Sequence, residues 1–107
     1  MKEIILCAAI WYKEIKLVRE IPQVLPKNID RGIVVLGHRH GQVIWTVACL
    51  TGLRTVEIAE DGVGEHEQGF ITNTNRFVGR QEAKVIAEAA GQITATPHKE
   101  LYSEDLY

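Results

Sequence analysis

Every residue from Ile4 to Tyr12 is apolar, and this run narrows the choice of folds at once. Nine residues are too few to cross a bilayer as a helix, so the run does not indicate a membrane protein. Its β-branched and aromatic side chains, among them Ile10 and Trp11, favour a strand over a helix. We therefore expect a buried strand in a soluble protein.

A second apolar strand is predicted at 33–36, where it is closed by Gly37. Between the two strands, the segment 19–32 contains Pro22 and Pro26, which disfavour both a continuous helix and a central strand. We expect this segment to be a loop or an irregular arm, across which the two strands pair in antiparallel fashion.

Two segments place apolar residues at helical spacing. The first, 41–51, is followed by Gly52, and the second, 80–90, is followed by Gly91. Glycine is favoured just past the end of a helix, so both segments predict helices with defined ends. The apolar positions are Val43, Ile44, Val47 and Ala48 in the first helix, and Ala83, Ile86, Ala87 and Ala90 in the second.

Between the helices, strands at 68–72 and 75–78 predict a hairpin, preceded by a weak edge strand at 55–60. After the second helix, the chain returns to a polar tail. This order of elements predicts an α+β fold, a small antiparallel β-sheet with two α-helices packed on one face. A chain of 107 residues is near the commonest domain size, so we expect a single domain, 1–107.

The charge balance argues against long nucleic acids as partners. Twelve basic and 14 acidic residues give a formal net charge of −2, which provides no field that attracts DNA or RNA. A small anion needs only a local cluster of donors. Cys7 and Cys49 lie in apolar segments without a sign of a disulfide, and Glu3 lies where a signal peptide is basic, so we expect a protein of the cytoplasm.

Basic residues precede or begin both predicted helices: His38, Arg39 and His40 at the first, and Arg80 at the second. A helix N-terminus carries unpaired N–H donors and partial positive charge, so cations there are unfavourable unless an anion meets them. The two helix starts are therefore candidate phosphate or carboxylate sites. In the alternative interpretation, Glu82 offsets Arg80, and the histidines are neutral and bond locally.

The segment 69–80 holds residue types that stack a base, read its edge and neutralise phosphate. One of its two aromatic rings is expected in the core, and core packing remains the alternative for each ring. The candidates are Phe70, Asn73, Asn75, Arg76, Phe77 and Arg80.

The sequence provides little for catalysis. His38 and His40 are spaced to share a metal with His66 or Cys49, but no further ligand stands at a recognisable spacing. There is no P-loop, dinucleotide-binding glycine pattern or nucleophile elbow. We expect binding without catalysis, and no metal or other cofactor.

An ordered set of motifs resembles the phage Thoeris anti-defence sponge family of the first type. The resemblance extends over residues 37–106 and includes Ala8-Ala9-Ile10 near the start. The motifs are Gly37-His38-Arg39-His40, Gln68-Gly69-Phe70, Arg76-Phe77-Val78-Gly79-Arg80-Gln81-Glu82-Ala83, Ala90-Gly91-Gln92-Ile93 and Leu101-Tyr102-Ser103-Glu104-Asp105-Leu106.

The resemblance implies a phage protein that sequesters cyclic ADP-ribose isomers, the signals made by a bacterial TIR-domain enzyme, in the cytoplasm of the infected cell. Some members of the family also hold cyclic di- or trinucleotides. Members are homo-oligomers built from dimers, with a hexamer as a trimer of dimers and ligand recesses at subunit boundaries. No cofactor and no turnover are implied.

Carried onto this sequence, the family pattern assigns adenine stacking to Phe70 or Phe77 and edge reading to Asn73 or Asn75. It assigns the phosphates to Arg39, Arg76 and Arg80, with His38 beside them. The sequence departs from the pattern at Asn75, where glycine is usual, at Tyr107, where tryptophan is usual, and in inserts at 19–32 and 53–66.

Two other functions remain as alternatives. One is a metal-dependent phosphodiesterase or ADP-ribose hydrolase that uses His38, His40 and the carboxylates of Glu65 and Glu67. The other is an inhibitor that binds a host protein through the acidic loop or the C-terminal tail.

Overall fold

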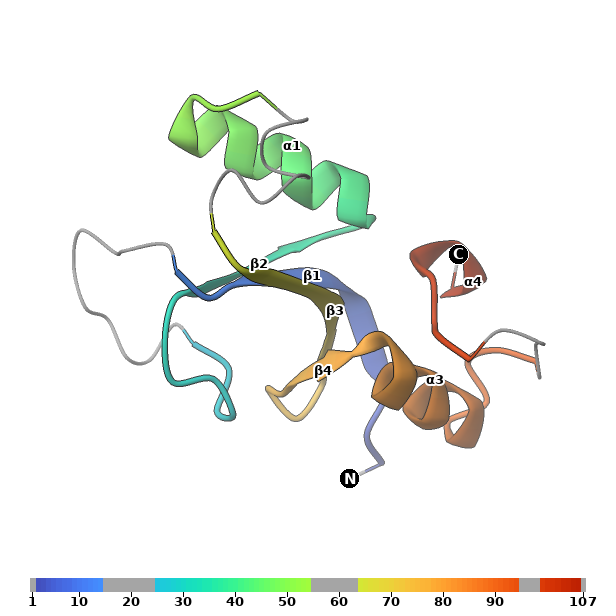
Figure 1. Ribbon diagram of the computed structural model, residues 1–107. Helices are drawn as coiled ribbons and strands as arrows, with labels where there is room; N and C mark the ends of the chain where they lie inside the picture. The colour runs from blue at the N-terminus through green and yellow to red at the C-terminus, as the bar shows by residue number, and fades with distance from the viewer. Residues whose placement is uncertain (1, 15–24, 55–63, 95–98, 107) are drawn as a thin grey trace.

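The computed structural model describes residues 2–14, 25–54, 64–94 and 99–106. Four strands form one antiparallel sheet in the order β2-β1-β3-β4, accompanied by helices (Figure 1). The α+β fold is therefore as predicted, whereas the weak strand expected at 55–60 lies outside the described residues. The elements are β1 (Ile5–Tyr12), β2 (Ile33–Gly37), α1 (His40–Thr51), β3 (His66–Thr72), β4 (Phe77–Gly79), α3 (Arg80–Ala89) and α4 (Ser103–Leu106).

The apolar run forms β1, which pairs with β2 on one side and with β3 on the other. Because neither edge of β1 is free and both of its faces are covered, the strand needs no polar side chain. Ala8 and Ile10 face the helices, and Ala9 faces away from them; none of the three is exposed to solvent. The antiparallel pairing predicted between the first two strands is confirmed.

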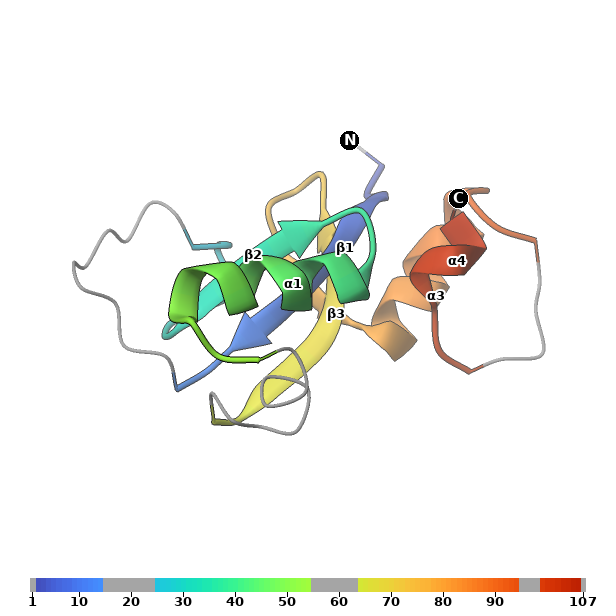
Figure 2. The same cartoon turned by 90° about the horizontal axis from the view of Figure 1, so that it is seen from above.

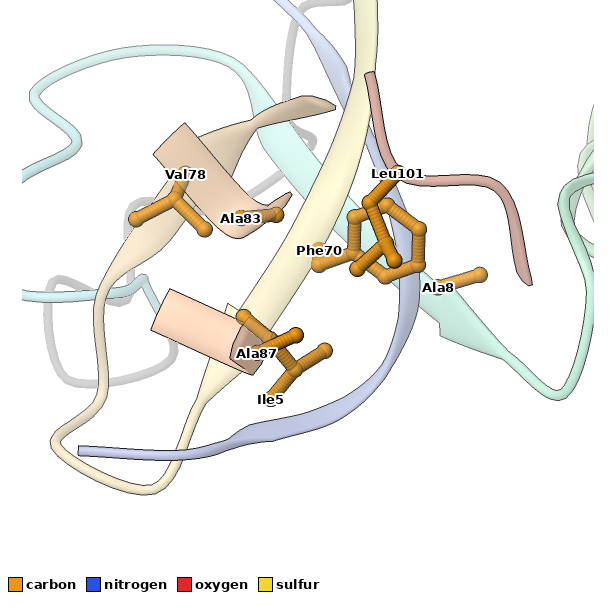
Figure 3. Close-up of a cluster of buried hydrophobic side chains, with 7 residues drawn as sticks. All are labelled: Ile5, Ala8, Phe70, Val78, Ala83, Ala87 and Leu101. Atoms are coloured by element: carbon orange, nitrogen blue, oxygen red, sulfur yellow. The ribbon is translucent and has the colours of Figure 1, made fainter. Parts of the chain in front are cut away.

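Both long helices pack on the same face of the sheet, as predicted. Helix α1 packs through Val43 and Val47 on the β1 side chains beneath it, whereas α3 packs through Ala83 and Ala87. The small alanine side chains let the α3 axis approach the sheet closely. Ala83 and Ala87 belong to one core cluster with Phe70, and Figure 3 shows the Phe70 ring against Leu101 and next to Ala8.

The helix ends also agree with the sequence. Gly52 follows α1 in the left-handed conformation, with φ of 77°, and Gly91 follows α3 with φ of 72°. These are backbone angles that glycine adopts without the steric penalty of a Cβ atom. Within the described residues, neither helix has the length and apolar character that a membrane crossing requires.

The described part of the arm, from residue 25 onward, covers the opposite face of the sheet. Ile29 is buried there with Ile71 and Phe77. The side chain of Asn28 holds the arm in place, because it accepts a hydrogen bond from the backbone N–H of Phe77 and donates one to the carbonyl of the same residue. The sheet is thus covered by helices on one face and by the arm on the other.

Two predicted boundaries were wrong. The strand expected at 75–78 begins only at Phe77, because Asn75 adopts φ of 63° and belongs to the turn. The C-terminal segment is not a polar tail: Leu101 is fully buried in the core, and its backbone N–H donates to the carbonyl of Arg80. This docking brings α4 beside the first turn of α1, as both views show (Figures 1 and 2).

Candidate functional site

The two basic helix starts come together in one cluster. His40 is the first residue of α1 and Arg80 the first residue of α3. The Nη2 atom of Arg80 lies 3.4 Å from Nδ1 of His40. From the sequence, the two helix starts were predicted to be two separate sites, because no local pattern relates segments that are 40 residues apart. In the fold, both starts lie on the same side of the sheet.

His40 is a buried, neutral link in this cluster. Its Nε2 atom lies 2.7 Å from the carbonyl oxygen of Gly69, and its ring meets the Phe70 ring edge-on at 5.1 Å. A carbonyl only accepts, so Nε2 carries the proton, and Nδ1 is left to accept from Arg80. Burial, together with the nearby Arg80 charge, lowers the pKa of His40, which favours this neutral form.

Among the residues that the structure describes, the partners of Arg80 are neutral. Its Nη1 atom donates to the carbonyl of Leu101 at 2.9 Å, and Nη2 donates to Oε1 of Gln68 at 2.5 Å. The guanidinium lies 5.1 Å from the centre of the Tyr102 ring. Within the described ranges, no carboxylate forms an ion pair with Arg80. Its charge is positioned but not neutralised.

Arg39 is the N-cap residue of α1 and lies on the rim of the same cluster. Its backbone N–H donates to Oε1 of Gln42 at 3.1 Å, which fixes the first turn. Its Nη1 atom is 3.7 Å from Oε1 of Glu104 in α4, a pair in which the Glu104 side chain is 71% exposed. The protein thus places a weakly held carboxylate near a helix start, where an anion is favoured.

Arg76 is a structural residue. Its Nη2 and Nε atoms donate to the two oxygens of Glu3 at 2.7 and 2.9 Å, and Nη2 also reaches Glu82 at 3.1 Å. Thr72 and Thr74 donate to the same carboxylate of Glu3. Arg76 is therefore neutralised by the protein itself, and it fastens the N-terminal segment to the hairpin and to α3.

The hydrogen bond from Arg76, followed by that from Thr74, lowers the pKa of Glu3 from 4.5 to about 2. The folded state therefore holds a proton on Glu3 less readily than the unfolded state does. This contribution to stability is complete above pH 4.5 and is lost as the pH falls toward 2. We expect Glu3→Gln to lower the free energy of unfolding at pH 7 by about 2 kcal/mol.

Urea denaturation at several pH values checks this prediction. The difference in midpoint between wild type and Glu3→Gln is expected to shrink steadily between pH 4.5 and pH 2.5. Glu100→Gln, which removes a carboxylate with no ion pair among the described residues, is the matched control. A difference that stays constant over this pH range would contradict the role given to Glu3.

The two predicted amides and His38 lie outside the cluster. Asn73 accepts a hydrogen bond from the backbone N–H of Ile4 at 2.8 Å and donates to the carbonyl of Lys2, so it anchors the N-terminal segment. Asn75 is exposed at the tip of the hairpin, and His38 is exposed just before α1.

The two phenylalanines are both core residues. Phe70 has no solvent exposure, and Figure 3 shows Leu101 packed against its ring, whereas Phe77 is 5% exposed beneath the arm. The Phe77 ring also meets Trp11 edge-on, with ring centres 6.0 Å apart. Within one chain, neither ring presents a face on which a base could stack.

Of the predicted residues, the fold therefore gathers only Arg39 and Arg80, with His40 between the two helix starts. It adds three residues that residue-type reasoning did not select: Gln68, Tyr102 and Glu104. All three occur in the quoted motifs, a signal from which they could have been selected. Gln68 reaches the site from β3, and Tyr102 and Glu104 reach it because the C-terminal segment docks on Arg80.

The geometry gives no support to a metal centre. Among residues 2–14, 25–54, 64–94 and 99–106, no three His, Cys, Asp or Glu side chains are grouped so that they could hold a metal ion. The carboxylates of Glu65 and Glu67 both lie near the ammonium group of Lys13, at 3.6 and 3.4 Å. Glu65 and Glu67 thus share one structural partner, whereas His40 is bound to Gly69 and Arg80.

A family model described as the phage T4 y16D protein matches residues 4–107, which is nearly the whole chain. No curated protein and no solved structure matches.

Proposed function

The chain belongs to the phage T4 y16D protein family. We propose that it serves a phage as an anti-defence sponge, the role that the resemblance of its motifs implies. In this role it binds nucleotide immune signals in the cytoplasm of the infected bacterium and withholds them from their effector. The ligands are cyclic ADP-ribose isomers, including glycocyclic forms, and cyclic di- or trinucleotides as a second group. The protein releases them unchanged, so it is not an enzyme.

The observation that carries this proposal is the state of Arg80. A half-buried guanidinium is costly without an anion, yet this one is held by a carbonyl, an amide and a neutral imidazole. Four neutral contacts, counting the Tyr102 ring, fix its position without cancelling its charge. Such a group is ready to receive a phosphate oxygen from solution, because its desolvation cost has already been met by folding.

The surroundings of Arg80 suit a phosphorylated ligand. Arg80 itself is at the start of α3, and Arg39 caps the start of α1, so two helix N-termini add partial positive charge on the same side. Glu104 holds Arg39 through an exposed pair, which a phosphate can replace at little cost. The diphosphate of an ADP-ribose isomer provides two adjacent phosphates, each with one negative charge.

A sponge acts by mass action, and this dictates what the site must achieve. At signal concentrations well above Kd, each site removes about one ligand, so the protein must be abundant and must release slowly. Charge-assisted hydrogen bonds from a fixed guanidinium favour slow release, because they need no reorganisation on binding.

Titration with cyclic ADP-ribose tests the proposal directly. We expect saturable, tight binding by calorimetry, and we expect chromatography of the heat-denatured complex to return the ligand intact. Cleaved ligand, in amounts that fall when a chelator is added, would instead identify the metal-dependent hydrolase. Absence of binding, with a stoichiometric host protein captured in its place, would identify the inhibitor of a host factor.

We also propose that the active form is a homo-oligomer built from dimers, with a hexamer as the full assembly. The exposed side of α1 supports a contact between copies: Trp45 is 66% exposed and Leu50 is 74% exposed. Helix α1 contains no Asp, Glu, Lys or Arg, so two copies could meet there without desolvating a charge.

Trp45→Glu tests this contact. A carboxylate placed in an apolar interface is buried without a partner. The dissociation constant of the oligomer should therefore rise at least tenfold. Light scattering after size-exclusion chromatography is expected to show oligomers for wild type and monomers for Trp45→Glu. Val85→Glu makes the same change at a position on α3 that is 68% exposed, and serves as the control. Monomeric wild-type protein at all concentrations would refute the assembly.

A further inference from the structure

We propose that Tyr102 is the residue that selects nucleotides over other phosphates, by stacking its ring against the planar base of the ligand. This inference rests on the proposed function, because it concerns the same site around Arg80. It assigns to the C-terminal segment the role that residue types had suggested for Phe70 or Phe77, both of which are buried.

The position of Tyr102 sets it apart from the other aromatic residues of the described chain. Tyr102 is 40% exposed, and the guanidinium of Arg80 lies 5.1 Å from the centre of its ring. Trp11 also lies beside a cation, 4.6 Å from Lys13, but that ammonium is already paired with two carboxylates. Tyr102 thus combines an exposed aromatic side chain with a cation that forms no ion pair with a carboxylate of the described residues.

The backbone holds the Tyr102 ring in place before any ligand arrives. The preceding residue, Leu101, is fully buried and exchanges two hydrogen bonds with Arg80, one from its N–H and one to its carbonyl. On the other side, Asp105 accepts from the backbone N–H of Tyr102 and donates its own N–H to the Tyr102 carbonyl. A ring fixed in this way loses little entropy on binding, which favours affinity.

The chemistry of this pair defines the ligand class. A phosphate on Arg80 and a flat ring against Tyr102 require a molecule with an anionic group close to an aromatic heterocycle. Stacking is tolerant of base identity because every base has a π-face, so purine and pyrimidine nucleotides both qualify. Sugar phosphates and polyphosphates without a base lack the second contact and should bind more weakly.

Two substitutions separate stacking from mere packing. Tyr102→Phe keeps the aromatic face, and Tyr102→Leu keeps an apolar side chain without it. In calorimetric titrations with cyclic ADP-ribose, we expect Tyr102→Phe to stay within twofold of wild type and Tyr102→Leu to bind about 10-fold to 100-fold more weakly, the loss typical of one stacked base.

The dependence of Kd on salt then shows whether the ring acts on the base or through Arg80. If Tyr102 stacks the base, Tyr102→Leu binds more weakly but keeps the wild-type sensitivity to salt, because the phosphate contact is intact. Loss of that sensitivity would show that the ring merely positions Arg80, and equal affinity of wild type and Tyr102→Leu would also overturn the inference. Wild-type protein that fails to bind cyclic ADP-ribose at all would refute the proposed function itself.

Discussion

Arg80→Ala is expected to weaken the binding of cyclic ADP-ribose by about 100-fold, on the order of 3 kcal/mol. The loss has two sources. The ligand phosphate loses its charged donor, and the carbonyl and amide oxygens that now orient Arg80 are left turned toward the ligand. The negative partial charges of these oxygens, which face the guanidinium in wild type, would then face the phosphate of the ligand. The variant should therefore bind the ligand more weakly than a surface that lacks these oxygens.

The control for this experiment is another arginine. Arg31→Ala removes the same charge from an exposed position in the arm, on the opposite face of the sheet. It should leave Kd within twofold of wild type. Thermal unfolding of both variants checks the fold, because Arg80 also binds the C-terminal segment through Leu101. Equal affinities of Arg80→Ala and wild type, with both folded, would remove the basis for a binding site at the helix starts.

The different roles of Arg80 and Arg76 could not be predicted from the sequence. Both arginines lie in the same short segment and were assigned the same role. What distinguishes them is Glu3, which lies 73 positions before Arg76 and takes up its charge. A pairing over such a distance depends on the N-terminal segment running beside the hairpin. The residue types near Arg76 in the sequence do not indicate its pairing with Glu3.

The sheet and its two long helices were more accessible to prediction, because their signals are local. The apolar run at 4–12 has no polar face, and the fold gives β1 two paired edges and two covered faces. Gly52 and Gly91 mark helix ends because a helix often ends at a residue with positive φ, and this requirement comes only from the adjacent helix. Burial of Phe70 and Phe77, in contrast, depends on which elements cover each face of the sheet.

The C-terminal segment was misjudged for a related reason. Between 99 and 106 it is rich in polar residues, which resembles a solvated tail. One side chain, Leu101, is enough to dock it, because Leu101 packs against the Phe70 ring in the same core cluster as Ala83 and Ala87 (Figure 3). The site thus depends on a core contact between distant segments, which a local reading of the sequence does not reveal.

Gly69→Ala is expected to be strongly destabilising. Gly69 faces Gly79 across the β3–β4 pair, and a Cβ atom at Gly69 would overlap the carbonyl oxygen of Val78 and lie 2.7 Å from the Phe77 ring. Neither neighbour can yield cheaply, since one is backbone and the other is buried in the core. We expect a loss of about 3 kcal/mol in the free energy of unfolding, measured by urea denaturation.

Gly41→Ala provides the opposite case with the same chemical change. Gly41 lies in the first turn of α1, and a Cβ atom there would meet no other atom within 4 Å. Alanine restricts the unfolded chain and favours the helix, so this variant should gain about 0.5 to 1 kcal/mol.

Because Gly69 also accepts the hydrogen bond that orients His40, Gly69→Ala should loosen Arg80 as well, and any protein that remains folded should bind cyclic ADP-ribose more weakly. Equal stability of the two variants would show that β3 and β4 are not packed as closely as the structure requires.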